Sequence, residues 1–114
     1  NTPVRWTNNI SPELTKGFDY SPWYLLSDKG DSYSIAHHTV MKNHENGRGY
    51  YAINFYKSFL NDGKVLRVLL NRAVLRTFTP SESLPSNWKL LDAAHLDDNP
   101  ANNTFENLQF MTHQ

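Results

Sequence analysis

The sequence has 114 residues, of which 39% are hydrophobic and 13% aromatic, with 11 basic and 11 acidic side chains and no cysteine. This length and composition fit a single globular domain over residues 1–114, and they exclude an intrinsically disordered chain, disulfide bonds and thiolate zinc sites. No apolar run approaches the ~20 residues of a membrane-spanning helix and no signal-peptide pattern stands at the N-terminus, so we expect an intracellular protein of a reducing compartment with no membrane partner.

The N-terminal part of the chain predicts an irregular segment followed by a β-hairpin. Proline and glycine interrupt residues 1–22, which therefore favour no regular element. Residues 23–27 and 32–36 have the composition of two strands, and the Asp-Lys-Gly-Asp segment at 28–31 is typical of the turn between them. Residues 37–48 are polar and predict a loop, so we expect a β-rich arm over about residues 1–48.

A second hairpin is predicted in the middle of the chain. Apolar side chains alternate over residues 49–56 with the period of a half-buried strand. The Asn-Asp-Gly-Lys segment at 61–64 predicts a turn, and residues 65–69 predict the partner strand.

A short helix is predicted directly after this hairpin, over residues 70–78. Leu70, Val74 and Phe78 repeat every fourth position, which places them on one helix face. Thr79-Pro80 ends the helix, because the residue before a proline avoids helical backbone angles.

The C-terminal part predicts a short strand at 88–94 between the loops at 81–87 and 96–105, and a final helix that begins at 106 and runs to 114. The elements together predict an α+β fold, with a small antiparallel β-sheet and a short helix.

The polar segment that begins at His95 carries the strongest functional signal. Residues 95–113 read His-Leu-Asp-Asp-Asn-Pro-Ala-Asn-Asn-Thr-Phe-Glu-Asn-Leu-Gln-Phe-Met-Thr-His. A lone histidine at a strand end is usually structural. Here it is followed at fixed offsets by an Asp-x-Asn turn, an Asn-Asn pair and a Glu-Asn-Leu-x-Phe-x-Thr string. Asn and Asp side chains suit such a loop because they form hydrogen bonds with nearby backbone.

This segment resembles the phage and homing-endonuclease branch of the His-Asn-His (HNH) endonuclease family. The family pattern is Asn/Asp-His, then Asp-Gly-Asn, Asn-Asn and Glu-Asn-Leu-x-Trp-x-Thr. Residues 49–55 followed by residues 64–78 are similar to the strand pair and short helix of that family, and residues 24–30 are similar to the Tyr-x-Val-Ser-Asn-x-Gly (NUMOD4-like) segment that often precedes it. The resemblance implies an HNH-like module over about residues 49–114 that ends in a ββα-metal (His-Me finger) hairpin.

The resemblance also implies chemistry: a metal-dependent endonuclease that hydrolyses phosphodiester bonds in duplex DNA, with RNA as the alternative partner. His95 would be the general base, and Asn107 would hold the hairpin loop so that His95 is in position. Mg²⁺ or Mn²⁺ would be the cofactor, with no organic cofactor. The family further implies the cytoplasm of a bacterial or phage-infected cell.

The distribution of charge fits a nucleic-acid partner. Residues 42–89 hold eight basic and three acidic side chains, whereas the last 25 residues hold four acidic side chains and no basic one. A basic centre beside an acidic tail suits a protein that contacts phosphate with one face and binds a metal with another, and an ordinary solvated surface is the competing interpretation. The candidate phosphate contacts are Arg67, Arg72, Arg76, Lys57 and Lys64.

The sequence departs from the family pattern at both metal ligands. Ala94 stands where the family has Asn or Asp before the histidine, and the second ligand, about twenty-one residues after the histidine, would fall beyond Gln114. Asp92 shares a strand face with Ala94, and His113 precedes the second position by about one helical turn, so these two are candidate substitutes.

Two further interpretations of this departure stay open. The chain would be an engineered or trimmed nuclease, or a natural domain that binds nucleic acid as a non-catalytic or ribonucleoprotein scaffold. A protein-interaction domain that has kept only the fold is a third functional class.

Overall fold

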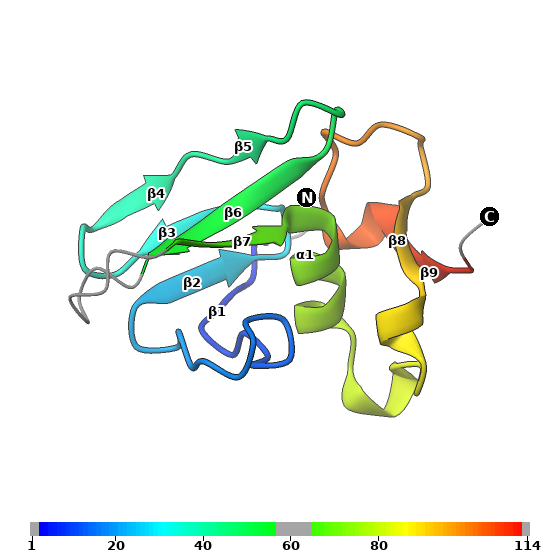
Figure 1. Ribbon diagram of the computed structural model, residues 1–114, viewed down its shortest axis with the longest axis horizontal. Helices are drawn as coiled ribbons and strands as arrows, with labels where there is room; N and C mark the ends of the chain where they lie inside the picture. The colour runs from blue at the N-terminus through cyan, green and yellow to red at the C-terminus, as the bar shows by residue number, and fades with distance from the viewer. Residues whose placement is uncertain (1–2, 57–64, 113–114) are drawn as a thin grey trace.

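Three antiparallel sheets and one helix make up the part of the chain that the structure describes, residues 3–56 and 65–112 of a computed structural model (Figure 1). The helix, α1 (Leu70–Phe78), lies between the N-terminal sheets and the C-terminal hairpin. No helix in the described ranges is long and apolar enough to cross a membrane.

The N-terminal sheet has the strand order β1-β2-β3-β4. Its strands are β1 (Trp6–Thr7), β2 (Tyr24–Ser27), β3 (Ser32–Ser34) and β4 (Thr39–Met41). The predicted hairpin is therefore confirmed, with both strands slightly shorter than expected. The prediction of no regular element over 1–22 is wrong in part, because β1 pairs with β2. The prediction of a loop over 37–48 is wrong in part, because β4 pairs with β3 through backbone although its own side chains are mostly exposed.

The second sheet has the order β5-β6-β7. Its strands are β5 (His44–Glu45), which also lies in the predicted loop, β6 (Tyr51–Tyr56) and β7 (Val65–Leu69). The prediction that β6 is half-buried is wrong: four successive residues from Ala52 to Phe55 are buried, so both faces of the strand are covered. The rings of Tyr20 and Tyr24 lie 4.9 and 5.0 Å from the ring of Phe55 and join this strand to the N-terminal sheet.

Helix α1 has the bounds that the sequence predicts. Leu70, Ala73, Val74 and Leu75 are buried, and the helix contacts β6 and β7 on one side and β8 and β9 on the other. No side chain caps its N-terminus. Because burial of a leucine or valine side chain contributes about 1.5–3 kcal/mol, packing rather than capping stabilises this helix.

The C-terminal hairpin consists of β8 (Asp92–His95) and β9 (Leu108–Met111). Short 3₁₀ turns lie in the same part of the chain: η2 (Ser81–Ser83) follows α1, η3 (Trp88–Leu90) precedes β8, and η4 (Phe105–Asn107) precedes β9. The predicted strand at 88–94 therefore begins later, after η3.

The predicted helix over 106–114 is wrong within the described residues, where β9 stands instead. Leu108 and Phe110 lie toward the interior and alternate with exposed Gln109 and Met111, which is the period of a strand. Pairing with β8 satisfies the backbone of this short segment.

The α+β class is confirmed, and the two strands expected of the ββα unit are present, although its helix is not among the described residues. The predicted turn at 61–64 lies outside the described residues. The division into an arm over 1–48 and a module over 49–114 stays a prediction. Contacts cross that boundary: the Phe105 N–H, for example, donates to the Asp28 carbonyl at 2.7 Å.

Candidate active site

His95 is the last residue of β8 and lies directly opposite Leu108 of β9. The ladder continues one step further, where the Leu96 N–H donates to the Asn107 carbonyl at 2.8 Å. The imidazole is half-buried, and its ring lies 6.0 Å from the ring of Tyr50 at an angle of 40°. The hairpin therefore holds this side chain on paired backbone while part of it remains exposed.

The loop between β8 and β9 is organised around the Asp97 carboxylate. It accepts hydrogen bonds from the Asn102 side chain, the Asn99 backbone N–H and the Asn107 side chain, each at 2.9 Å. These three donors, in that order of effect, lower the pKa of Asp97 from 3.8 to about 2. The ionised carboxylate is therefore part of the loop's folded structure.

Asn107 closes the same loop from its C-terminal end. Its side-chain Nδ2 donates to the Asn102 carbonyl at 2.9 Å, and its Oδ1 accepts from the Asp97 backbone N–H at 3.2 Å. The side chain thus joins the two ends of the loop that follows His95. Its part in catalysis stays a prediction.

Asn103 is a site residue that was not among those predicted from the sequence. Its side-chain Oδ1 lies 2.8 Å from Nε2 of His95, and its Nδ2 donates to the Pro100 carbonyl at 3.1 Å. Asn103 is only 5% exposed. The Asn-Asn pair was visible in the sequence, but nothing in its spacing predicted that Asn103 would contact the imidazole of His95.

An open cleft of about 560 Å³ lies against His95. One wall comes from β8, one from the start of α1, and one from the turn between β5 and β6, which contributes Arg48 and Tyr50. The cleft also receives Asp98 and Pro100 from the loop after His95. The predicted general base thus faces a space that is open to solvent and lined by both charged and apolar groups.

The cleft does not offer a metal site that the described residues complete. Asp92 and Ala94 both line it, but the methyl group of Ala94 cannot coordinate a metal. The amide oxygen of Asn71, at the start of α1, is buried there without a hydrogen-bond partner. As a metal ligand it would carry no charge. Within residues 3–56 and 65–112, no three His, Asp or Glu side chains are grouped so that they could hold a metal ion. Mg²⁺ and Mn²⁺ favour sites rich in carboxylate oxygens, so this donor set does not fit them, and His113 lies outside the described residues.

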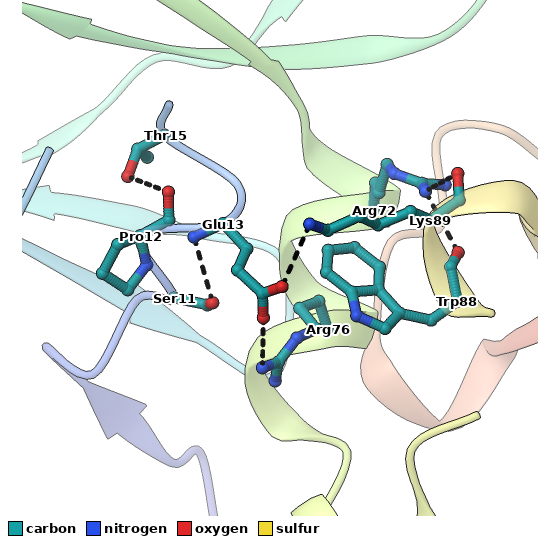
Figure 2. Close-up of polar contacts among 8 residues, drawn as sticks. All are labelled: Ser11, Pro12, Glu13, Thr15, Arg72, Arg76, Trp88 and Lys89. Carbon is teal, nitrogen blue, oxygen red and sulfur yellow. Dashed lines mark hydrogen bonds and ion pairs between the residues drawn. The ribbon is translucent and has the colours of Figure 1, made fainter. Parts of the chain in front are cut away.

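Two of the predicted phosphate contacts are engaged within the protein (Figure 2). The Arg72 guanidinium donates to the carbonyls of Trp88, Lys89 and Leu91 at 2.6–3.1 Å and lies 5.3 Å from the Trp88 ring. Arg76 lies 5.2 Å from the same ring and forms an ion pair with Glu13 at 3.3 Å. Hydrogen bonds from Lys89, which has the larger effect, and from Arg76 lower the pKa of Glu13. Phosphate binding by Arg72 and Arg76 stays a prediction.

The other basic candidates are placed differently. Arg67 is exposed on β7, where its Nε donates to Asn54 at 3.0 Å, and Lys57 and Lys64 lie outside the described residues. Arg48, which the sequence analysis counted only as part of the net charge, is exposed and lines the cleft beside His95. Its position between Gly47 and Gly49, both with positive φ, marks a tight turn before β6.

Comparison with known proteins gives matches by sequence and by structure. No family model matches the sequence. The chain is 33% identical over 93 residues, or 82% of its length, to the H-N-H endonuclease F-TflII of Escherichia phage T5. A solved structure described as DNA binding and cleavage by the HNH homing endonuclease I-HmuI covers 95% of the chain with a TM-score of 0.72 and 27% identity.

The chain spans about half the length of each relative: 45% of the phage T5 protein and 52% of the homing endonuclease chain. The similarity therefore concerns this part of those proteins. The structural match covers nearly the whole chain. On these grounds the chain belongs to the HNH endonuclease family.

Proposed function

We propose that this chain is the nuclease part of an HNH endonuclease that hydrolyses phosphodiester bonds in duplex DNA. The observation that carries the proposal is one open cleft lined both by a half-buried His95, held by Asn103, and by the exposed cation of Arg48. The names of the two relatives support it, since both are endonucleases and one is described with DNA binding and cleavage. The phage relative further supports a role on DNA inside a bacterial cell.

In the proposed reaction, His95 accepts a proton from a water molecule in the cleft. The hydroxide attacks phosphorus, the bond between phosphorus and the leaving oxygen breaks, and solvent protonates that oxygen. Arg48 contacts a non-bridging phosphate oxygen and stabilises the negative charge that builds up there. A positioned general base contributes about 10²–10⁴-fold to the rate of such a step.

Only membership of the HNH family supports metal dependence. HNH nucleases imply Mg²⁺ or Mn²⁺ and no organic cofactor, but Asp92 is the sole described carboxylate on the strand that carries His95. Because the donor set does not fit, the steps above use only the groups of this chain.

The proposal is tested by conversion of supercoiled plasmid to nicked or linear DNA, with Mg²⁺ or Mn²⁺ present. We expect conversion by the unchanged chain and by a His37→Ala control, because His37 lines a different hollow, between β3 and β6. We expect it to be lost in His95→Ala. Conversion that is equal in all three proteins would remove His95 from the mechanism, and no conversion by any of them would count against nuclease activity in this chain.

A scaffold that binds nucleic acid without cutting is the second candidate, and Ala94 is the observation that favours it. In that case the chain would bind DNA or RNA with strong salt dependence and leave both intact. Ala94→Asp separates the two candidates. If only this variant nicks plasmid, the natural chain is a disabled nuclease. If neither cuts and both bind, the scaffold function replaces the proposal, and binding to neither DNA nor RNA would favour a protein-interaction domain.

A further inference from the structure

We infer that Asn103 is the positioning residue of His95, and that the turn between β2 and β3 holds Asn103 in place through Gly30. The inference about geometry stands on the described contacts alone. Its consequence for catalysis rests on the function proposed above.

The contact of Asn103 with Pro100 decides the direction of the hydrogen bond between the Asn103 and His95 side chains. Nδ2 of Asn103 donates to the Pro100 carbonyl at 3.1 Å, so the amide oxygen is the atom that lies 2.8 Å from Nε2 of His95. The opposite orientation of the amide would place two oxygens against each other at Pro100. Because an amide oxygen only accepts, Nε2 of the neutral imidazole must carry the proton.

The other imidazole nitrogen of His95, Nδ1, is left without a proton. A neutral imidazole with its proton on Nε2 has an unprotonated Nδ1 with a lone pair. Asn103 therefore selects the tautomer in which Nδ1 is the atom able to accept a proton from water. Without this bond the ring would be free to exchange tautomers and to rotate about its side-chain torsions.

Contact with Gly30 holds Asn103 in turn. The backbone and Cβ of Asn103 pack directly on Gly30: a Cβ added at Gly30 would lie 3.0 Å from the Asn103 carbonyl oxygen and 3.1 Å from the Asn103 Cβ. Gly30 has φ +88° and lies in the turn between β2 and β3, close to the carbonyl of Asp28 that accepts from the Phe105 N–H at 2.7 Å. A turn more than seventy residues earlier in the chain thus supports the loop that orients His95.

Gly17 provides a matched control for Gly30. Its φ is +85°, so an alanine there meets the same backbone strain, but nothing lies within 4 Å of the added Cβ. Any effect of Gly30→Ala beyond that of Gly17→Ala is therefore due to the contact with Asn103.

The test reads the His95 ring directly, by ¹⁵N–¹H long-range correlation NMR of the full chain without DNA at a pH where the ring is neutral. The His95 signals are identified by their loss in His95→Gln. We expect the unchanged chain, Asn103→Asp and Gly17→Ala to show the proton on Nε2, since one aspartate oxygen still accepts from Nε2 although the other can no longer donate to the Pro100 carbonyl. We expect Asn103→Leu and Gly30→Ala to move the ring nitrogens toward a mixture of tautomers.

The same variants are then compared for plasmid nicking. Asn103→Leu and Gly30→Ala should lower the rate by about 10–100-fold, the effect of removing groups that orient a functional histidine, while Asn103→Asp should recover a larger part of it. A proton on Nδ1 in the unchanged chain would overturn the inference, as would unchanged ring signals in Asn103→Leu or equal changes in Gly17→Ala and Gly30→Ala.

These outcomes remain informative in two unfavourable cases. If Asn103→Leu does not fold, the spectrum of the unchanged chain and the glycine pair still decide the question. If the unchanged chain does not nick DNA, the proposed function fails, whereas the ring signals still show whether Asn103 positions His95.

Discussion

The Asp97 carboxylate shows how a single exposed residue holds the loop of the candidate site. Three neighbouring donors stabilise its charged form and lower its pKa to about 2. Its contribution to stability is therefore fully present above the ordinary carboxyl range and is lost as the pH falls through the pKa of the folded state.

This linkage gives a prediction for acid conditions. Asp97→Asn should be less stable than the unchanged chain at pH 6, and the difference in free energy of unfolding should shrink between about pH 4.5 and pH 2, because the unchanged carboxyl becomes protonated there. Urea unfolding at a series of pH values measures the difference. A difference that does not change over this range would show that the charge of Asp97 does not stabilise the loop.

Arg48 is the residue on which DNA binding through the cleft should depend. Arg48→Gln should weaken binding to short duplex DNA and reduce the slope of log K against log salt by about 0.9, the value of one phosphate contact. Lys16→Asn is the control: it removes an exposed charge that does not line the cleft, and asparagine tolerates its φ of +54°. If both variants had the same affinity for DNA and the same salt dependence, DNA would bind outside the cleft.

At the scale of elements, α1 contacts η3 at the Trp88 ring, and Glu13 of the N-terminal segment pairs with Arg76 and Lys89 beside it. Arg72 and Arg76 both lie over this ring, but only Arg72 donates to three backbone carbonyls at the end of η3. Arg72 therefore joins the helix to the segment that leads into β8.

Replacing Arg72 should destabilise the protein more than replacing Arg76. Arg72→Gln leaves carbonyls without their donors and should cost about 1–3 kcal/mol, whereas Arg76→Gln removes mainly an ion pair worth at most about 1 kcal/mol. Urea unfolding of both variants provides the comparison. An equal loss would mean that contact with Trp88, which both arginines share, is the main contribution.

The sequence predicted the bounds of β7 and α1 because the signals there are local. The apolar period changes at Leu70, and Thr79-Pro80 ends the helix. It did not predict β1, β4, β5 or β9, since these strands are short and are stabilised by backbone pairing with segments that lie elsewhere in the chain. Four residues with alternating apolar character cannot by themselves distinguish such a strand from the start of a helix.

The same distinction applies to the site. The spacing within one segment singled out His95 and Asn107. The approach of Arg48 to the cleft and of Gly30 to Asn103 joins residues far apart in the sequence, so composition and spacing carried no signal for either contact.

At the scale of the whole molecule, packing contacts join the N-terminal sheet to β6 and to the C-terminal hairpin. Tyr20 and Tyr24 pack on Phe55 of β6, and the turn at Gly30 packs on the loop after β8. The predicted arm therefore supplies a part of the core that the predicted module would lack.

A chain limited to residues 49–114 should consequently not fold. We expect it to show no cooperative unfolding transition in circular dichroism and poor dispersion in amide NMR spectra, in contrast to residues 1–114. A cooperative transition in the shorter chain would instead establish the module as an independent domain.

We propose that His95, held in the cleft by the β8–β9 hairpin, accepts the proton from the attacking water. The most direct test is the single-turnover rate of duplex DNA cleavage at saturating protein, for the unchanged chain and for His95→Ala, with DNA binding measured on the same samples. We predict equal binding and a rate that falls by about 10²-fold or more in the variant. Equal rates at equal binding would contradict the claim.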